Sequence, residues 1–495
     1  MRDIVVGIDA STTSVKAIAF DRHGRELLQA RESYPLSNPH PGHFEQDPED
    51  WWSALIKALR TLTRGGVADR IAAMAIAHQR ETFTLLDARG AALVPAILWL
   101  DERARPQVAR LSARFGRDRI REWTGKPPDP TPALYALAWL AEHRPQAVEK
   151  TVAVADVNAF LARRLTGRLA TSTASADPLG LLHIASGQWQ PELVEEVGLR
   201  PEQLPALLPP GAEMGRLSED VARQTGLTSG LPLFAGAGDG QAMGLGMGVV
   251  SEGKSYLSLG SGIVGGTYSP NYVNSDAFRT LVAPSGGFML ETVLRSGMQL
   301  VEWAVRTTGG QPFAKLEAAA RSIAPGSGNL LVLPYWAGVM SPYWDETARG
   351  AIFGLSLDHT PAHMFRAVLE GIAFEQALAT EALEEACGRP GGAIVAAGGG
   401  TQSTLLVEIM ASALERPLAI SPVNEAAALG AAMLAATGAG WYADVPAASR
   451  AMTAEPTRQV EPLADLKAAY RARRPIYGDL YRATRSVHRS LAGLG

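Results

Sequence analysis

Short apolar runs alternate with polar or glycine-rich turns along the first 100 residues, a pattern typical of β-strands. The expected strands are residues 3–8, 15–20, 26–33, 70–77, 82–86 and 96–100. Asp47, Glu49 and Asp50 begin a predicted helix that runs through Leu62, since acidic side chains suit the positive end of a helix dipole. Residues 127–197 are expected to be helical with proline breaks, and residues 200–230 to form a proline-punctuated connector.

Strands and helices alternate again in the second half of the chain. The expected strands are residues 254–259, 263–269, 330–333 and 393–397, and the expected helices are residues 363–388, 401–414, 425–440 and 466–491. The last of these helices is rich in basic residues and is interpreted as a solvated face. This alternation predicts an α/β protein. Because 495 residues are too many for one core, we expect two domains, residues 1–245 and 246–495.

Composition narrows the possible partners and the compartment. The hydrophobic content of 46% and charged content of 19% are ordinary for a globular protein, and the net charge of −4 gives no electrostatic footprint for nucleic acid. The single Cys387 excludes an internal disulfide framework. The start of the chain has no apolar signal segment, and no apolar run is long enough to span a bilayer. A cytoplasmic protein that binds neither nucleic acid nor membrane is expected.

One carboxylate stands out near the middle of the chain. The apolar run 231–237 is followed by Gly238, Asp239 and Gly240, which predicts a strand that ends in a turn with an exposed carboxylate. Such a group can act as a base. Asp-Gly is also a common turn pair, so a plain solvated aspartate stays open as an alternative.

Two turns between predicted strands have the composition of phosphate-binding loops. Residues 260–265 match G-x-G-x-x-G, but a β-branched, glycine-rich segment follows where a dinucleotide-binding turn would open a helix, which favours a hairpin. The backbone amides of such a hairpin can form a nest for phosphate. Residues 9–14 form a similar turn rich in hydroxyl groups, followed by a strand that carries Lys16. Two such hairpins suggest two related halves that face one another.

Polar residues follow two of the predicted strands in the first half. Arg80 and Glu81 come after residues 70–77, and Trp99 and Asp101 lie at and after the end of residues 96–100. Strand ends in α/β sheets are common ligand sites, and these side chains offer charged partners for hydroxyl groups and a flat face for the C–H edge of a sugar. A surface salt bridge and a core tryptophan are the alternative interpretation.

A run of three glycines separates a predicted strand from a predicted helix in the second half. Gly398, Gly399 and Gly400 would let the backbone approach a flat ring or a phosphate closely. Glycine runs also occur in plain flexible turns, so composition alone leaves both interpretations open.

A segment near residue 360 carries a family signature. Residues 350–370 read GAIFGLSLDHTPAHMFRAVLE and resemble the C-terminal signature of the FGGY family of carbohydrate kinases, within the actin, hexokinase and Hsp70 superfamily. The resemblance extends from Gly7 to about Gly440 and includes the Asp239 loop. It implies two ribonuclease-H-like, actin-like ATPase domains with a catalytic cleft between them. It also implies ATP and Mg²⁺ as cofactors and a small sugar or polyol as the partner, and a homodimer stays open.

The resemblance assigns roles residue by residue. Asp239 would be the general base, and Asp9 and Asp239 would hold Mg²⁺. The substrate would contact Arg80, Glu81, Trp99, Asp101 and Asp239. ATP would contact Ser11, Thr12, Thr13, Lys16, Ser261, Gly262, Gly399, Gly400, Ser403 and Asn424. One departure is Ser11, which stands where the family more often has glycine.

Evidence for the substrate is mixed. Residues 95–99 followed by Asp101 are similar to xylulokinases, whereas Arg80 and Glu81 are similar to glycerol kinases, although those carry a tyrosine at the position of Thr131. The expected acceptor is therefore D-xylulose or a related ketopentose, with glycerol or a tetritol as the alternative. A non-catalytic sugar sensor on the same fold and a dehydrogenase that uses residues 260–265 are the alternatives from other classes.

Overall fold

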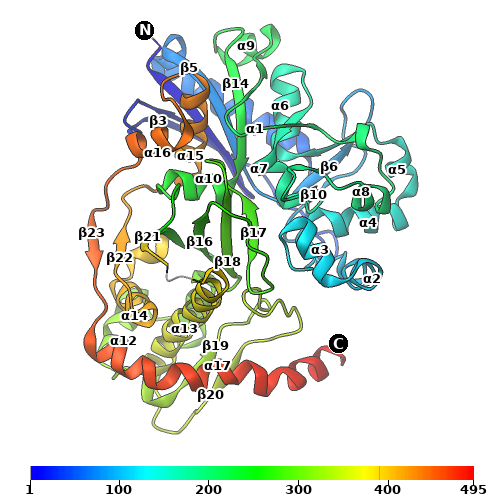
Figure 1. Cartoon of the computed structure of the whole chain (residues 1–495). Coiled ribbons are helices and arrows are strands. Elements are labelled where there is room, and N and C mark those ends of the chain that lie inside the picture. Colours follow the sequence, from blue (N-terminus) through cyan, green and yellow to red (C-terminus); the bar gives the residue numbers. More distant parts are fainter. Residues whose placement is uncertain (1, 389–390, 495) are drawn as a thin grey trace.

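Two mixed β-sheets with the same connectivity organise the chain (Figure 1). The computed structural model describes residues 2–388 and 391–494. In each sheet three antiparallel strands are followed by two parallel ones. The first set is β1 (Ile4–Ala10), β2 (Ser14–Phe20), β3 (Glu26–Ser33), β5 (Ile71–His78) and β14 (Pro232–Gly238). The second set is β15 (Lys254–Leu259), β16 (Ile263–Ser269), β18 (Phe288–Leu294), β21 (Ala393–Ala397) and β22 (Leu418–Ile420). The expected pair of related α/β halves is confirmed.

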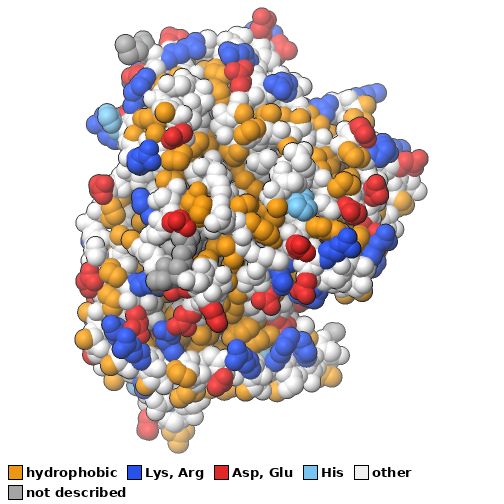
Figure 2. Space-filling model, viewed as in Figure 1, with side chains coloured by type: hydrophobic (Ala, Val, Ile, Leu, Met, Phe, Trp, Pro, Cys, Tyr) orange, Lys and Arg blue, Asp and Glu red, His pale blue; other side chains and the backbone are white. Residues whose placement is uncertain are grey.

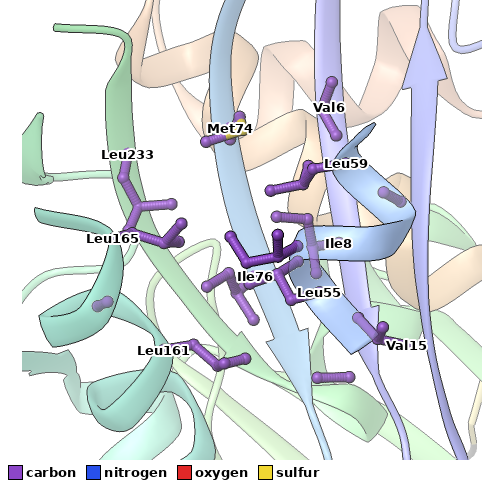
Figure 3. Close-up of a cluster of buried hydrophobic side chains, with 14 of the residues drawn as sticks. Val6, Ile8, Val15, Leu55, Leu59, Met74, Ile76, Leu161, Leu165 and Leu233 are labelled. Carbon is purple, nitrogen blue, oxygen red and sulfur yellow. The ribbon is translucent and has the colours of Figure 1, made fainter. Parts of the chain in front are cut away.

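Helices from the first half cover one face of the first sheet. Helix α1 (Pro48–Leu62) begins as expected after Asp47, whose side chain accepts a hydrogen bond from the Glu49 amide. Leu55 and Leu59 of α1 pack on Val6 and Ile8 (Figure 3). Helix α6 (Val157–Thr166) contributes Leu161 and Leu165 to the same cluster. All seven residues of β1 are buried, as expected for a strand covered on both faces.

The other face of the first sheet is covered by a helix from the second half. Helix α15 (Ala426–Gly438) packs on β1, β5 and β14, and a Cβ atom at Gly7 would lie only 1.9 Å from the Ala428 carbonyl oxygen. Helix α10 (Asp239–Gly246) follows the first sheet but packs on the second, where Gly244 faces Tyr256 and Met289. The two halves therefore exchange helices. The proposed boundary at residues 245 and 246 separates the two sheets but assigns both of these helices to the opposite half.

Helices α10 and α15 cross with their backbones in contact. A Cβ atom at Gly430 would lie 1.9 Å from the Ala242 carbonyl oxygen, and one at Gly246 would lie 2.1 Å from that of Ala426. Any side chain larger than hydrogen would separate the helices at these points.

Short strands form a smaller sheet that the sequence did not predict in full. Strands β4 (Glu45–Gln46), β7 (Ala96–Ile97), β6 (Phe83–Leu86) and β8 (Ala153–Asp156) lie side by side, beside α2 (Arg105–Phe115), α3 (Arg117–Thr124), α4 (Ala133–His143) and α5 (Pro145–Lys150). The expectation that residues 127–197 are helical is wrong for β8, β9 (Ala170–Ser172), β10 (Leu182–His183) and β11 (Gln188–Trp189). Residues 200–230 contain β12 (Ala206–Leu208), β13 (Glu213–Arg216) and α9 (Glu219–Thr225) rather than a plain connector. Strands of two to four residues are too short for a clear alternating pattern, and β8 and β9 also pair with strands far away in the sequence, so local patterning hardly indicates them.

The second half contains the expected strand and helix pattern with small shifts. The other strands and helices of the second half are β17 (Arg279–Val282), α11 (Met298–Thr307), α12 (Phe313–Arg321), β19 (Leu331–Leu333), β20 (Ala351–Phe353), α13 (Pro361–Cys387), α14 (Thr404–Leu414), α16 (Val445–Met452), β23 (Arg458–Val460) and α17 (Ala464–Ala492). No helix within the described ranges combines the length and apolar character needed to cross a membrane. On the face shown in Figure 2, acidic and basic side chains are interspersed.

The C-terminal helix α17 is not a purely solvated face, which corrects the expectation. Its Tyr470, Tyr477 and Tyr481 are buried, and their hydroxyl groups donate hydrogen bonds to Glu370, Glu375 and Asp345. One stripe of this basic helix thus closes the core of the second half, while its charged side chains face outward.

We expect Gly430→Ala to lower the free energy of unfolding by about 1–3 kcal/mol, because an added methyl group overpacks the crossing of α10 and α15. Urea denaturation measures the change. Gly478→Ala in α17 is the matched control: its nearest neighbour would be Leu378 Cδ2 at 3.7 Å, so better helix propensity should leave stability unchanged or raised by up to about 1 kcal/mol. Equal effects at both positions would contradict a tight crossing.

Stability should also depend on pH through Glu375. Burial raises the pKa of this carboxyl to about 7, although hydrogen bonds from Tyr335 and Tyr477 act to lower it. A folded-state pKa above the unfolded value means that the contribution is complete below about pH 4.5 and is lost as the pH rises through 7. The free energy of unfolding of Glu375→Gln, relative to that of the wild type, should therefore increase by roughly 2 kcal/mol between pH 5 and pH 8.

Urea denaturation at the two pH values measures this difference. The control is Glu415→Gln, because Arg471 pairs with Glu415 and lowers the pKa of that carboxyl, which places its titration below the range tested. A Glu375→Gln variant whose stability relative to wild type is the same at both pH values would refute the assignment.

Candidate functional site

The polar residues expected at strand ends meet at one edge of the first sheet. Strands β1, β5 and β14 are parallel neighbours, and they deliver Asp9, then Arg80 and Glu81, then Asp239 to the same side. This is the edge at which open α/β sheets bind ligands. Partners from the second half complete the site, since Arg80 and Glu81 pair with Glu291 and Arg279.

Asp239 is the first residue of helix α10, not a residue of a turn as the sequence suggested. Its side chain is 39% exposed, its Oδ1 atom lies 3.2 Å from Nε of Arg80, and the same oxygen accepts a hydrogen bond from the Gly240 amide at 2.8 Å. The second oxygen remains accessible to a ligand because only Oδ1 is used in these contacts. An accessible carboxylate fixed at one oxygen has the geometry of a general base.

Asp9 lies almost fully buried in β1, next to the like negative charge of Asp239. Its Oδ1 atom has no hydrogen-bond partner among the described residues. Burial and, second to it, the charge of Asp239 raise the pKa of Asp9 to about 7, while Lys16 acts to lower it. A buried oxygen without a partner beside a second carboxylate fits a hard divalent cation. Within the described residues no group of three acidic, His or Cys side chains could hold a metal, so phosphate oxygens and water would complete its coordination.

Four of the residues expected to bind the nucleotide lie in or beside the N-terminal hairpin between β1 and β2. Ser11 donates to the Ser14 carbonyl at 2.9 Å, and Thr12 accepts from the Trp99 indole at 3.0 Å. Thr13 is exposed, and Lys16 pairs with Glu425 at the start of α15. The hairpin is thus tied to both the Trp99 side of the site and the second half.

The second hairpin joins β15 to β16, which confirms that residues 260–265 do not open a helix. Ser261 at its tip is exposed and Gly262 is half-buried. The amides of Met298 and Gln299, at the start of α11, donate to the carbonyl groups of Gly260 and Ser261. A Cβ atom at Gly262 would lie 3.1 Å from the Leu294 carbonyl oxygen and 3.3 Å from that of Arg295, which leaves little room for a larger residue.

The glycine run after β21 differs from position to position. A Cβ atom at Gly399 would meet no heavy atom within 4 Å, whereas one at Gly400 would lie 2.8 Å from Leu259. Ser403 caps α14 and donates to Glu317 at 2.6 Å, so its hydroxyl is already used. Asn424 is exposed before α15. Gly399 and Asn424 are therefore the members of this group that are open to a ligand.

Trp99 and Asp101 have different surroundings. The Trp99 ring is 37% exposed, as a platform for a sugar requires. Asp101 is buried, accepts from the Phe44 amide at 2.7 Å and is paired with Arg103 at 2.8 Å. The Asp101 carboxylate thus holds neighbouring groups in place, and a direct contact with substrate remains a prediction.

Arg80 and Glu81 do not form the exposed salt bridge that was the alternative interpretation. Both are buried, and their partners are Glu291 of β18 and Arg279 of β17. Sequence reasoning missed these two partners. The available signal was a single charged residue in each of two mostly apolar strands, Arg279 at the start of β17 and Glu291 within β18, since buried charges need partners.

Comparisons with known proteins agree with this architecture. Residues 4–246 match the N-terminal domain and residues 255–439 the C-terminal domain of the FGGY family of carbohydrate kinases. The xylulose kinase of Bacillus subtilis (strain 168) is 28% identical over 98% of both chains. The gluconokinase of the same organism is 26% identical over 99% of this chain and 98% of its own.

A third relative and one solved structure extend the comparison. The glycerol kinase of Methylibium petroleiphilum is 32% identical over 89% of this chain and 91% of its own. The crystal structure of xylulose kinase from Rhodospirillum rubrum has a TM-score of 0.91 and 26% identity, and covers 98% of this chain and all of that one. The chain therefore belongs to the FGGY family of carbohydrate kinases, which phosphorylate a sugar or polyol with ATP.

Proposed function

We propose that this enzyme transfers the terminal phosphoryl group of ATP to a hydroxyl of D-xylulose or a related ketopentose. The observation that carries the proposal is the position of Asp239, half exposed at the start of α10, beside Arg80 and the buried Asp9. Similarity to xylulose kinases over nearly the whole chain supports the choice of sugar. Glycerol or a tetritol is the second candidate, supported by the similarity to a glycerol kinase.

Asp239 acts as the general base in this proposal. A hydroxyl group is a poor nucleophile until its proton can leave. The accessible oxygen of Asp239 accepts that proton while the hydroxyl oxygen of the acceptor attacks phosphorus. Arg80 holds the other oxygen and fixes the direction of the carboxylate. Asp9 and Asp239 would hold Mg²⁺, which neutralises charge on the phosphate oxygens when bound.

The two hairpins supply the phosphate contacts. Ser11, Thr12 and Thr13 approach from the first half, while Ser261 and Gly262 approach from the second. Lys16, already paired with Glu425, would balance phosphate charge near Asp9. Gly399, Gly400, Ser403 and Asn424 would lie beside the nucleoside, with Ser403 acting through its cap of α14.

The acceptor would contact Arg80, Glu81 and Trp99, with Asp101 supporting the site through Arg103. A non-catalytic sensor is disfavoured because Asp9 and Asp239 are both present and lie close enough for the charge of Asp239 to act on Asp9. A homodimer and a cytoplasmic location stay predictions.

Asp239→Asn should abolish turnover while the protein stays folded, because an amide of the same shape cannot take the proton. Loss of a general base lowers the rate by on the order of 10² to 10⁴. A coupled assay of ADP release, with melting temperature as the folding check, measures the effect. Asp220→Asn, on the exposed surface of α9, is the control and should behave as wild type. Retention of more than about a tenth of wild-type activity in Asp239→Asn would remove the base assignment.

Glu81→Gln should raise the Michaelis constant for the sugar and leave that for ATP nearly unchanged. The reason is that a charge-assisted hydrogen bond to a hydroxyl contributes about 1.5–3 kcal/mol, against about 1 for a neutral one. Loss of one member of a buried ion pair with Arg279 should also lower the melting temperature. Glu213→Gln, which removes an exposed carboxylate that pairs with Arg216, is the control. A destabilised variant with normal sugar kinetics would limit Glu81 to a structural role.

A further inference from the structure

Four buried side chains of alternating charge form a chain beside Asp239. Arg80 donates through Nη1 to both oxygens of Glu291, at 3.0 and 2.9 Å. Arg279 donates through Nε to Glu291 at 2.7 Å and through Nη1 to Glu81 at 2.9 Å. The order is therefore Arg80, Glu291, Arg279, Glu81, with one end at the general base and both ends in the group expected to bind substrate.

The central members of this chain are removed from solvent. Glu291 is fully buried, and Arg279 is 5% exposed. Burial acts to raise the pKa of Glu291, but Arg80 and Arg279 outweigh it and hold the pKa below its usual value, so the carboxylate is ionised. A buried carboxylate shared by two guanidinium groups accepts hydrogen bonds from both, and Glu81 balances the second positive charge.

Helix α10 is shaped to admit the pair of Arg80 and Glu291. A Cβ atom at Gly240 would lie 2.9 Å from Cζ of Arg80 and 3.0 Å from Oε2 of Glu291. Glycine directly after Asp239 therefore gives the pair room to lie against the start of the helix. The same arrangement fixes the distance between Arg80 and the base, since Nε of Arg80 lies 3.2 Å from Asp239.

Other cations around the network are also paired. Lys126, whose charge acts on both Glu81 and Arg279, is bound to Asp177. Arg295 reaches Asp129 at 3.2 Å, and Lys16 is bound to Glu425. The four members of the network cancel in charge, so the carboxylate of Asp239 beside Arg80 adds a net negative charge to the site.

We propose that Glu291 and Arg279 are positioning residues that make the acceptor site select uncharged sugars and polyols against sugar acids. A carboxylate on the acceptor would need a cation without a partner, and Glu291 and Asp239 already satisfy Arg80. It would also face the charge of Asp239, so specificity comes from repulsion as well as from attraction. This inference rests on the proposed kinase function and names the acceptor class. Because this chain is also similar to a gluconokinase, the choice between neutral acceptors and sugar acids needs a test.

The wild-type enzyme gives the first test. At saturating ATP we would measure kcat/KM for D-xylulose, D-ribulose, glycerol and erythritol, and for D-gluconate and D-xylonate. The best neutral acceptor should exceed both acids by at least about 100-fold. An acid used as well as the best neutral acceptor would overturn the inference and leave the kinase function standing. Absence of phosphorylation of every acceptor would overturn the proposed function as well.

Glu291→Gln gives the second test, because it removes the negative charge that partly balances the positive charges of Arg80 and Arg279. The ratio of kcat/KM for gluconate to that for the best neutral acceptor should rise at least tenfold, a change that loss of stability alone would not produce. Glu291→Asp keeps the charge and should keep the wild-type ratio, and Glu213→Gln is the surface control. A folded Glu291→Gln variant with the wild-type ratio would refute the role of Glu291. If this variant does not fold, the wild-type panel decides the proposal, since sugar acids must still be rejected.

Discussion

The close crossing of helices α10 and α15 is the constraint on which the site depends. Each helix follows one sheet and covers the other, and glycines at 246 and 430 bring their backbones together. The start of α10 carries Asp239, and the start of α15 carries Glu425, which holds Lys16. Packing between two apolar, small-residue helices therefore sets the distance between Asp239 and Lys16, which act on the same phosphate in the proposed mechanism.

A second link between the halves is electrostatic. Glu291, fully buried in the second sheet, holds Arg80 of the first half, and Arg80 in turn holds one oxygen of Asp239. A buried ion pair of this kind adds little to stability compared with apolar packing, because desolvation of both charges opposes their attraction. Its presence next to the base is better explained by the direction it gives to the carboxylate. In the proposed assignment, the second half thus contributes to the acceptor site as well as to the nucleotide site.

Much of the fold could be predicted because β1, β5, β14 and β21 are apolar over most of their length. Strand β21 and the predicted strand at Glu26–Ser33 have the expected bounds, and the hairpin at residues 260–265 followed from the β-branched residues after it. The start of α10 was missed because glycines flank Asp239 and mask a helix that tertiary contacts stabilise. Arg279 and Glu291 were missed since their partners lie about 200 residues away in the chain. The tyrosine stripe of α17 was hidden among its basic residues.

Asp9 shows why a polar residue at a plausible position in the sequence does not by itself indicate a role in the site. Asp101 was chosen for its position after a strand and Ser403 from the family resemblance, yet their side chains already have partners in Arg103 and Glu317. Asp9 differs because one oxygen is buried without a partner, and because Asp239 and burial together raise its pKa to about 7. A folded protein keeps such a group only where binding of a proton or a cation compensates for it, so an orphaned carboxylate is a stronger sign of function than its position after a strand. By that criterion Asp9, with the accessible carboxylate of Asp239 beside it, is a better candidate for the centre of the proposed site than the more numerous hydroxyl groups around them.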